Sequence, residues 1–215
     1  MAAATLRQIC LELLFASGIV SLDCSQIAQS QKSENGKTMK LLKALGGRQQ
    51  PLPECLTRSF GFPLQQLLQA SKEDARRAIG LILEEILDVF QLNFTQAEWN
   101  MSDTDLLQKA LFQQVMQWKG CSVEEKGDPS TFKDRRLRLR LKKYFLGIHR
   151  FLTEEEFSFC AWEAVRMDIL RSGYIALDQL VKALMVFCFI GDCRWRSGLW
   201  NDSSQEVIPE TSRFS

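Results

Sequence analysis

Histidine is nearly absent from this chain, since His149 is the single one among 215 residues. Nucleophilic catalysis by serine or cysteine usually needs a histidine as the base. A zinc site needs clustered cysteine or histidine ligands, and the chain has neither a Cys-x-x-Cys pair nor a second histidine. The sequence therefore predicts a protein that is not an enzyme, with no catalytic residues, no metal ligands and no cofactor.

Long apolar runs and an excess of charge of one sign are also missing. No segment reaches the roughly 18 uninterrupted apolar residues that a membrane-spanning helix needs. A formal net charge of +1 gives the whole chain no pull toward nucleic acid or a membrane surface. Because there are only five prolines, long stretches are free to form helices.

Residues 1–21 have the layout of a secretory signal peptide. Arg7 supplies a positive start, residues 9–20 are mostly apolar, and small residues near Ser21 are suited to cleavage. Glu12 inside the apolar run departs from this pattern, and an amphipathic first helix is the alternative. We expect export to the extracellular space, one helical domain over residues 22–186, and an atypical, disordered tail over residues 187–215.

Apolar residues recur with the period of an α-helix along the chain, and no strand pattern competes, so the fold class is all-α. Five helices are predicted, over residues 24–45, 72–90, 102–118, 132–152 and 156–186. The first has a polar middle containing Asn35-Gly36, and we expect it to be frayed or broken there. In the third, Leu106 and Met116 are expected to face inward.

Seven cysteines raise the question of redox state. Four of them, Cys24, Cys55, Cys121 and Cys160, fall in the predicted domain. Four cysteines allow three pairings, and their spacing does not choose among them. Disulfides agree with export, whereas free thiols would indicate an intracellular protein.

Three Asn-x-Ser/Thr triplets fit the acceptor pattern for N-glycosylation, at Asn93, Asn100 and Asn201. Asn93 and Asn100 lie between two predicted helices, where an exposed loop is expected. We therefore predict glycosylation at these two residues.

A basic run places seven lysines and arginines between Lys133 and Lys143. One interpretation is binding to nucleic acid or to heparan-like polyanions. The other is the solvated face of an amphipathic helix. Period 3.6 over the whole segment outweighs the strand-like Leu/Arg alternation at its start.

The segment from Cys160 to Ser172 is the most informative. Its apolar positions predict one buried helix face, and Glu163, Arg166, Asp168 and Arg171 are expected on the opposite face. This string resembles the last-helix signature of type I interferons. Three other strings also resemble this family, particularly its beta- and kappa-like members: Gly61-Phe62-Pro63, Asn93-Phe94-Thr95 and Lys142-Lys143-Tyr144-Phe145.

The resemblance implies an up-up-down-down helical cytokine bundle with five helices and a long first connection. It also implies the disulfides Cys24–Cys121 and Cys55–Cys160, because the family joins its first cysteine to its third and its second to its fourth.

The implied function is that of a secreted cytokine that binds the two chains of the type I interferon receptor, activates Janus kinase/STAT signalling and induces antiviral defence. The first receptor chain would meet Lys142, Lys143 and Tyr144 on the fourth helix. The second would meet the connection after the first helix and the exposed face of the fifth, at Leu56, Arg58, Met167, Arg171 and Tyr174. Two alternatives stay open: another secreted helical cytokine or growth factor, and an intracellular helical adaptor with a basic face.

Overall fold

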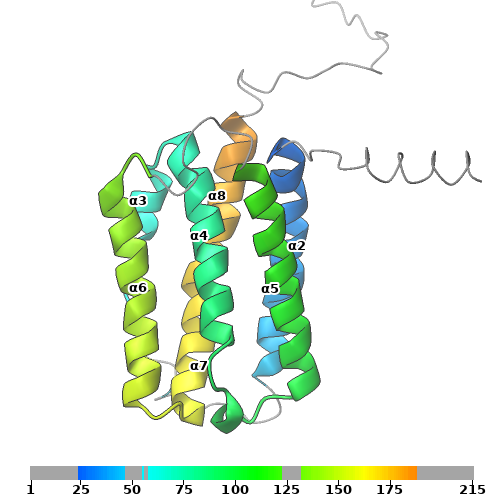
Figure 1. The fold of residues 1–215 in the computed structure, drawn as a ribbon, viewed down its shortest axis with the longest axis vertical. Helices are drawn as coiled ribbons and strands as arrows, with labels where there is room; N and C mark the ends of the chain where they lie inside the picture. The colour runs from blue at the N-terminus through cyan, green and yellow to red at the C-terminus, as the bar shows by residue number, and fades with distance from the viewer. Residues whose placement is uncertain (1–23, 47–54, 56–57, 123–131, 188–215) are drawn as a thin grey trace, which may run out of the picture.

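The computed structural model describes residues 24–46, 55, 58–122 and 132–187, and its regular elements within these ranges are all helical (Figure 1). The signal peptide and most of the C-terminal tail predicted from the sequence lie outside the described residues. The elements in chain order are α2 (Cys24–Leu45), α3 (Leu64–Leu68), α4 (Lys72–Phe90), η2 (Thr95–Ala97), α5 (Met101–Ser122), α6 (Arg135–Glu154), α7 (Phe159–Asp168), a π-helical turn (Ile169–Gly173) and α8 (Tyr174–Phe187). No helix in the described ranges is long and apolar enough to cross a membrane.

Four helical rods form the bundle. The first two, α2 and α4, run in the same direction, and α5 and the α7–α8 rod run back against them, as the colour gradient in Figure 1 shows. Both α2 and α4 pack against α5 and α8. The fifth rod, α6, packs against α4 and α7 on one side of this bundle. The arrangement is the up-up-down-down bundle with a long first connection that the family resemblance implies.

Side-chain caps explain where several helices begin. The Ser71 hydroxyl accepts a hydrogen bond from the amide of Asp74 at 3.2 Å, at the start of α4. The Asp134 carboxylate accepts from the amide of Arg136 at 2.8 Å, at the start of α6. Ser158 does the same for α7. Each side chain satisfies an amide that the first turn of a helix leaves without an intrahelical partner.

The predicted break in the first helix is wrong, because α2 is continuous. One face of its polar middle is buried, where Gln31, Asn35 and Thr38 are each 0% exposed. The Gln31 amide donates to Gln114 of α5 at 2.6 Å, and the Gln114 amide donates to the Thr38 hydroxyl at 2.7 Å. These bonds stabilise a helical segment that its local composition disfavours.

The other corrections concern where the last rod begins and which side chains of α5 face the core. The last rod begins at Phe159 rather than Glu156, because Glu156 has the positive φ of 51° that ends the preceding turn. In α5, Leu106 and Met116 point outward and are 49% and 52% exposed, so their predicted inward facing is wrong. The short helix α3 was not predicted.

One disulfide ties the long first connection to the bundle. Cys55 and Cys160 are joined, with an S–S distance of 2.04 Å. This is one of the two pairs that the family resemblance implies. For the other pair, Cys24 is the first residue of α2 and Cys121 is next to the last residue of α5. These two helix ends lie at the same end of the bundle in Figure 1. The side chains of this second pair lie outside the described residues.

Candidate functional site

The polar residues of the segment 160–172 are mostly buried, contrary to the expectation of an exposed face. Glu163 is 0% exposed and Arg166 is 4% exposed. They form an ion pair within α7 in which Arg166 Nη2 lies 2.5 Å from Glu163 Oε2. Helical periodicity placed these two residues on the exposed face of the helix, because the spacing of apolar residues carries no information about partners from distant parts of the chain.

Two distant segments complete this buried pair. Arg166 Nη1 donates to the carbonyl of Leu42 at 2.8 Å, near the end of α2, and Trp99 Nε1 donates to Glu163 Oε1 at 3.0 Å. A Cβ at Gly46 would lie only 2.3 Å from Arg166 Nη2, so the glycine leaves room for the guanidinium. The cluster therefore joins α2, α7 and the loop before α5, and its role is structural.

Tyr144 is also buried, at 3% exposed, which removes it from the predicted receptor contacts. Its hydroxyl donates to Asp168 Oδ2 at 2.6 Å, and this bond links α6 to α7. Burial raises the pKa of Asp168 above its usual value, while the hydrogen bond from Tyr144 and the charge of Arg171 oppose that rise. Burial also raises the pKa of the Tyr144 hydroxyl, and the Asp168 charge adds to that effect.

The raised pKa of Asp168 predicts a pH-dependent cost to stability. Between its unfolded and folded pKa values, the folded state binds more protons than the unfolded state, so the free energy of unfolding falls as pH rises. Asp168→Asn removes this titration and keeps an oxygen that can accept from Tyr144. We expect wild type to lose stability relative to Asp168→Asn as pH rises from about 3 to about 6.

Urea unfolding of both proteins across this pH range measures the effect. If the difference in unfolding free energy between the two proteins stays constant, or changes in favour of wild type as pH rises, folding does not raise the pKa of Asp168.

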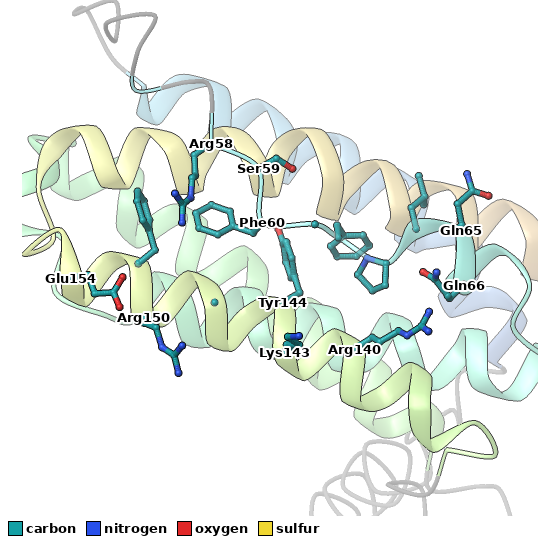
Figure 2. Close-up of a pocket in the computed structure, with 16 residues that line it drawn as sticks. Arg58, Ser59, Phe60, Gln65, Gln66, Arg140, Lys143, Tyr144, Arg150 and Glu154 are labelled. Atoms are coloured by element: carbon teal, nitrogen blue, oxygen red, sulfur yellow. The ribbon is translucent and has the colours of Figure 1, made fainter.

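A groove of about 780 Å³ lies between α6 and the connection that follows Cys55. Figure 2 shows Arg58, Ser59 and Phe60 from the connection on one side and Arg140, Lys143, Tyr144 and Arg150 from α6 on the other. The Arg58 guanidinium lies over the Phe151 ring at 5.0 Å and over the Phe60 ring at 5.7 Å. These cation–π contacts hold Arg58, which is predicted to contact the receptor, at the edge of the groove.

One stripe of α6 lines this groove: Arg140, Lys143, Gly147, Arg150 and Glu154. Their spacing of three or four residues places them on one face of the helix. Gly147 is unusual there, because glycine in a helix interior costs about 1 kcal/mol relative to alanine. A Cβ at Gly147 would meet nothing within 4 Å, so packing does not require the glycine. The spacing of Arg140 and Arg150 from Lys143 was present in the sequence and was not used.

The predicted basic pair is split between two environments. Both lysines are exposed. Lys142 forms an ion pair with Glu85 of α4, whereas Lys143 also lines the groove. A second hollow of about 410 Å³ is lined by both lysines, together with the exposed side chains of Leu139 and Leu146. The sequence analysis did not single out these two leucines.

The π-helical turn changes which side chains of the last rod face solvent, so the receptor contacts predicted there have to be revised. Arg171 is exposed and Met167 is partly buried against the core, but Tyr174 is 0% exposed and is no longer a contact residue. In a regular helix, residues three apart share a face, and the extra residue of a π turn changes that register. Ile175, 46% exposed, takes the outward position instead.

Both predicted glycosylation residues are exposed. The Asn93 side chain accepts hydrogen bonds from the amide and the hydroxyl of Thr95, at 3.0 and 2.6 Å. The Asn100 side chain accepts from the amide of Ser102 at 2.8 Å, at the start of α5. Leu56, a predicted receptor contact, and Asn201 lie outside the described residues.

Comparison with known proteins identifies the family of this chain. The family described as Interferon alpha/beta domain matches residues 27–184. The chain belongs to this family. It is 33% identical over 175 residues to interferon beta of Homo sapiens, across 79% of this chain and 91% of that protein. It is 30% identical over 179 residues to interferon omega-1 of Equus caballus, across 80% of this chain and 89% of that protein.

Solved structures agree on the fold. Zebrafish interferon 1 matches with a TM-score of 0.64 at 17% sequence identity, across 74% of this chain and 99% of that one. Zebrafish interferon 2 matches with a TM-score of 0.57 at 23% identity. The chain is thus a type I interferon family member with the helical cytokine fold. The family membership and fold support an interferon-like cytokine.

Proposed function

We infer that this protein is a secreted cytokine that acts by binding. It bridges the two chains of the type I interferon receptor on a cell surface, activates Janus kinase/STAT signalling and induces antiviral defence. The observation that carries this proposal is an exposed arginine beside an exposed aliphatic side chain: Arg171 on the π-helical turn and Ile175 one turn later. Arginine in the centre of an interface is a frequent source of binding energy.

The second receptor chain would meet Arg171, Ile175 and Arg58. The groove and Arg171 would belong to one receptor surface, because Asp168 connects them. It accepts a hydrogen bond from Tyr144, which lines the groove, and the charge of Arg171 acts on it. The first receptor chain would meet the neighbouring face of α6, where Lys142 lines a second hollow with Leu139 and Leu146.

Two alternatives become less favoured. A growth factor from an unrelated family does not fit the family match. An intracellular adaptor with free thiols does not fit the Cys55–Cys160 bond, since such bonds persist mainly in oxidising compartments. Secretion, glycosylation at Asn93 and Asn100, and a heparan-like partner for α6 complete the proposal.

Arg171→Ala tests the receptor surface. We expect it to weaken binding to the second receptor chain about tenfold or more, as for a central interface arginine. Binding to the first chain should be unchanged, because that surface lies elsewhere. The change in unfolding free energy should stay within about 0.5 kcal/mol, since the side chain is exposed. Surface plasmon resonance with each receptor ectodomain measures the two affinities.

Arg135→Ala serves as the matched control, because Arg135 is an exposed arginine at the start of α6, outside the groove. It should retain wild-type affinity for the second chain. Equal affinities for Arg171→Ala and wild type would sink the site assignment. Unfolding of Arg171→Ala would show that the arginine is structural.

A further inference from the structure

The outer face of α5 carries apolar side chains that belong neither to the core nor to the proposed receptor surfaces. Eight large apolar side chains are exposed among the described residues, and four of them lie on this one helix. None of the eight lies on α2 or α4. The four are Met101, Leu106, Phe112 and Met116, with exposed fractions of 74%, 49%, 54% and 52%.

The inner face of α5 is already covered by the bundle. Leu107, Leu111 and Val115 are buried, and the helix packs against α2 and α4. Apolar residues therefore lie on both the inner and the outer face, and a helix that is apolar all round is normally covered on all sides. Figure 1 shows α5 and α6 at opposite edges of the bundle, so the outer face of α5 is separate from the groove and from the second hollow.

Five exposed residues form a continuous seam along this outer face. Met101, Asp105 and Lys109 follow one another at intervals of four residues, and Phe112 and Met116 continue at intervals of three and four. Residues spaced in this way lie on one side of a helix. The seam is therefore apolar at both ends and carries one negative and one positive charge in its middle.

The order of these side chains is complementary to itself when a second copy of α5 runs antiparallel. A two-fold axis near residues 107–108 would place Met101 of each copy between Phe112 and Met116 of the other. The same axis would place Asp105 of each copy beside Lys109 of the other, offset by about 1.5 Å along the helix. Neither charged residue forms an ion pair within the described part of the chain, so both are available to a second copy.

We propose that the seam on α5 is the interface of a two-fold symmetric homodimer, in which the two α5 helices pack antiparallel. Most soluble oligomers are of this type, with the same patch on both subunits. The two charges in the seam disfavour a lipid surface as the occupant, because each would be buried without a partner.

The length of α5 sets the strength of this interface. With 22 residues, the helix is about 33 Å long. One pair of such helices should bury less than the roughly 1,200 Å² at the lower limit of a standard interface, so we expect a weak, reversible dimer. Because α6 lies at the other edge of each bundle, the dimer leaves the surfaces of α6 open (Figure 1). The inference does not depend on the proposed receptor function.

Sedimentation equilibrium of the full secreted chain tests the dimer. The average mass of wild type should rise with concentration from one chain toward two and level off there. Phe112→Ser/Met116→Ser should raise the dissociation constant about tenfold or more. The matched control Leu139→Ser/Leu146→Ser removes two exposed apolar side chains from α6 and should change the constant less than about threefold. A wild type that stays monomeric up to about 1 mM, a mass that rises past two chains, or equal effects of the two variants overturns the proposal.

A charge exchange tests the antiparallel register. Asp105→Lys alone would gather four lysines near the two-fold axis, and Lys109→Asp alone would gather four aspartates. Each single variant should weaken the dimer about tenfold, because like charges then face each other. The double variant Asp105→Lys/Lys109→Asp restores opposite charges across the axis and should return to within about threefold of wild type. Thermal unfolding checks that all three variants are folded. A folded double variant that is no better than the single variants overturns the antiparallel pairing.

Asn100 directly precedes the seam, so wild type is measured with its glycans and after their enzymatic removal. A dimer in either form supports the interface, and a dimer found only after removal would also assign its control to a glycan at Asn100. Monomers in both forms overturn the proposal.

Receptor binding is the competing use of this face. If wild type is monomeric and Phe112→Ser/Met116→Ser weakens binding to either receptor ectodomain, the face belongs to the receptor surface and the dimer is overturned. Loss of the dimer with unchanged receptor affinities supports the proposal. Loss of receptor binding in Arg171→Ala with the dimer retained concerns only the proposed receptor function.

Discussion

Replacing Glu163 with alanine is expected to destabilise the folded protein by about 3–5 kcal/mol, because a buried Arg166 guanidinium then loses its carboxylate. Arg166 is 4% exposed, so water cannot replace the missing partner without rearrangement. Trp99 Nε1, which donates to the same carboxylate, loses its acceptor as well. Urea denaturation of the variant and of wild type measures the difference in unfolding free energy.

The double variant Glu163→Leu/Arg166→Met is the control. It removes both charges and fills the space with apolar groups, so it should recover a substantial part of the lost stability, since burying an ion pair has its own desolvation cost. A second check uses Gly46. Gly46→Ala should be destabilising with Arg166 present and nearly harmless with Met at position 166, because the close approach at Gly46 is to the guanidinium. A Glu163→Ala variant within about 1 kcal/mol of wild type would show that the ion pair does not stabilise the fold.

The same cluster shows which features could be predicted from the sequence. Helical periodicity is a local property, so α4 and α6, with their long apolar stripes, were predicted to within a few residues. A buried charge depends on a partner far along the chain, such as the Leu42 carbonyl for Arg166. Periodicity alone assigns such a residue to solvent.

The predicted receptor contacts also divide into residues that the structure leaves exposed and residues that it buries. Arg58 and Arg171 were singled out through family resemblance, and both are exposed. Tyr144 and Tyr174 were singled out by the same reasoning, and both are buried. The register change at the π-helical turn could not be read from residue spacing, which assumes a regular helix. Ile175 became a candidate only when that turn was seen.

Cys160→Ser is expected to cost about 2–5 kcal/mol, the usual range for removing a native disulfide. The bond with Cys55 closes a long loop, with a sequence separation of 105 residues, and freeing it increases the entropy of the unfolded chain. The functional effect should be larger than a general loss of stability explains. Cys55 is buried three residues before Arg58, so its release frees the connection that forms one wall of the groove. Affinity for the second receptor chain should therefore fall at least tenfold even at temperatures where the variant is fully folded.

Cys55→Ser and the double variant test whether these effects come from one bond. Each single variant and the double variant should lose the same unfolding free energy to within about 0.5 kcal/mol, because all three remove the same crosslink. Non-reducing peptide mapping of the wild-type protein should recover the peptides of Cys55 and Cys160 joined together. A double variant that is much less stable than either single variant would mean that the two cysteines act independently. Wild-type receptor affinity in all three variants would show that the connection keeps its position without the bond, because α3 and the aromatic contacts of Phe60 and Phe62 are then sufficient to hold the groove wall against α6.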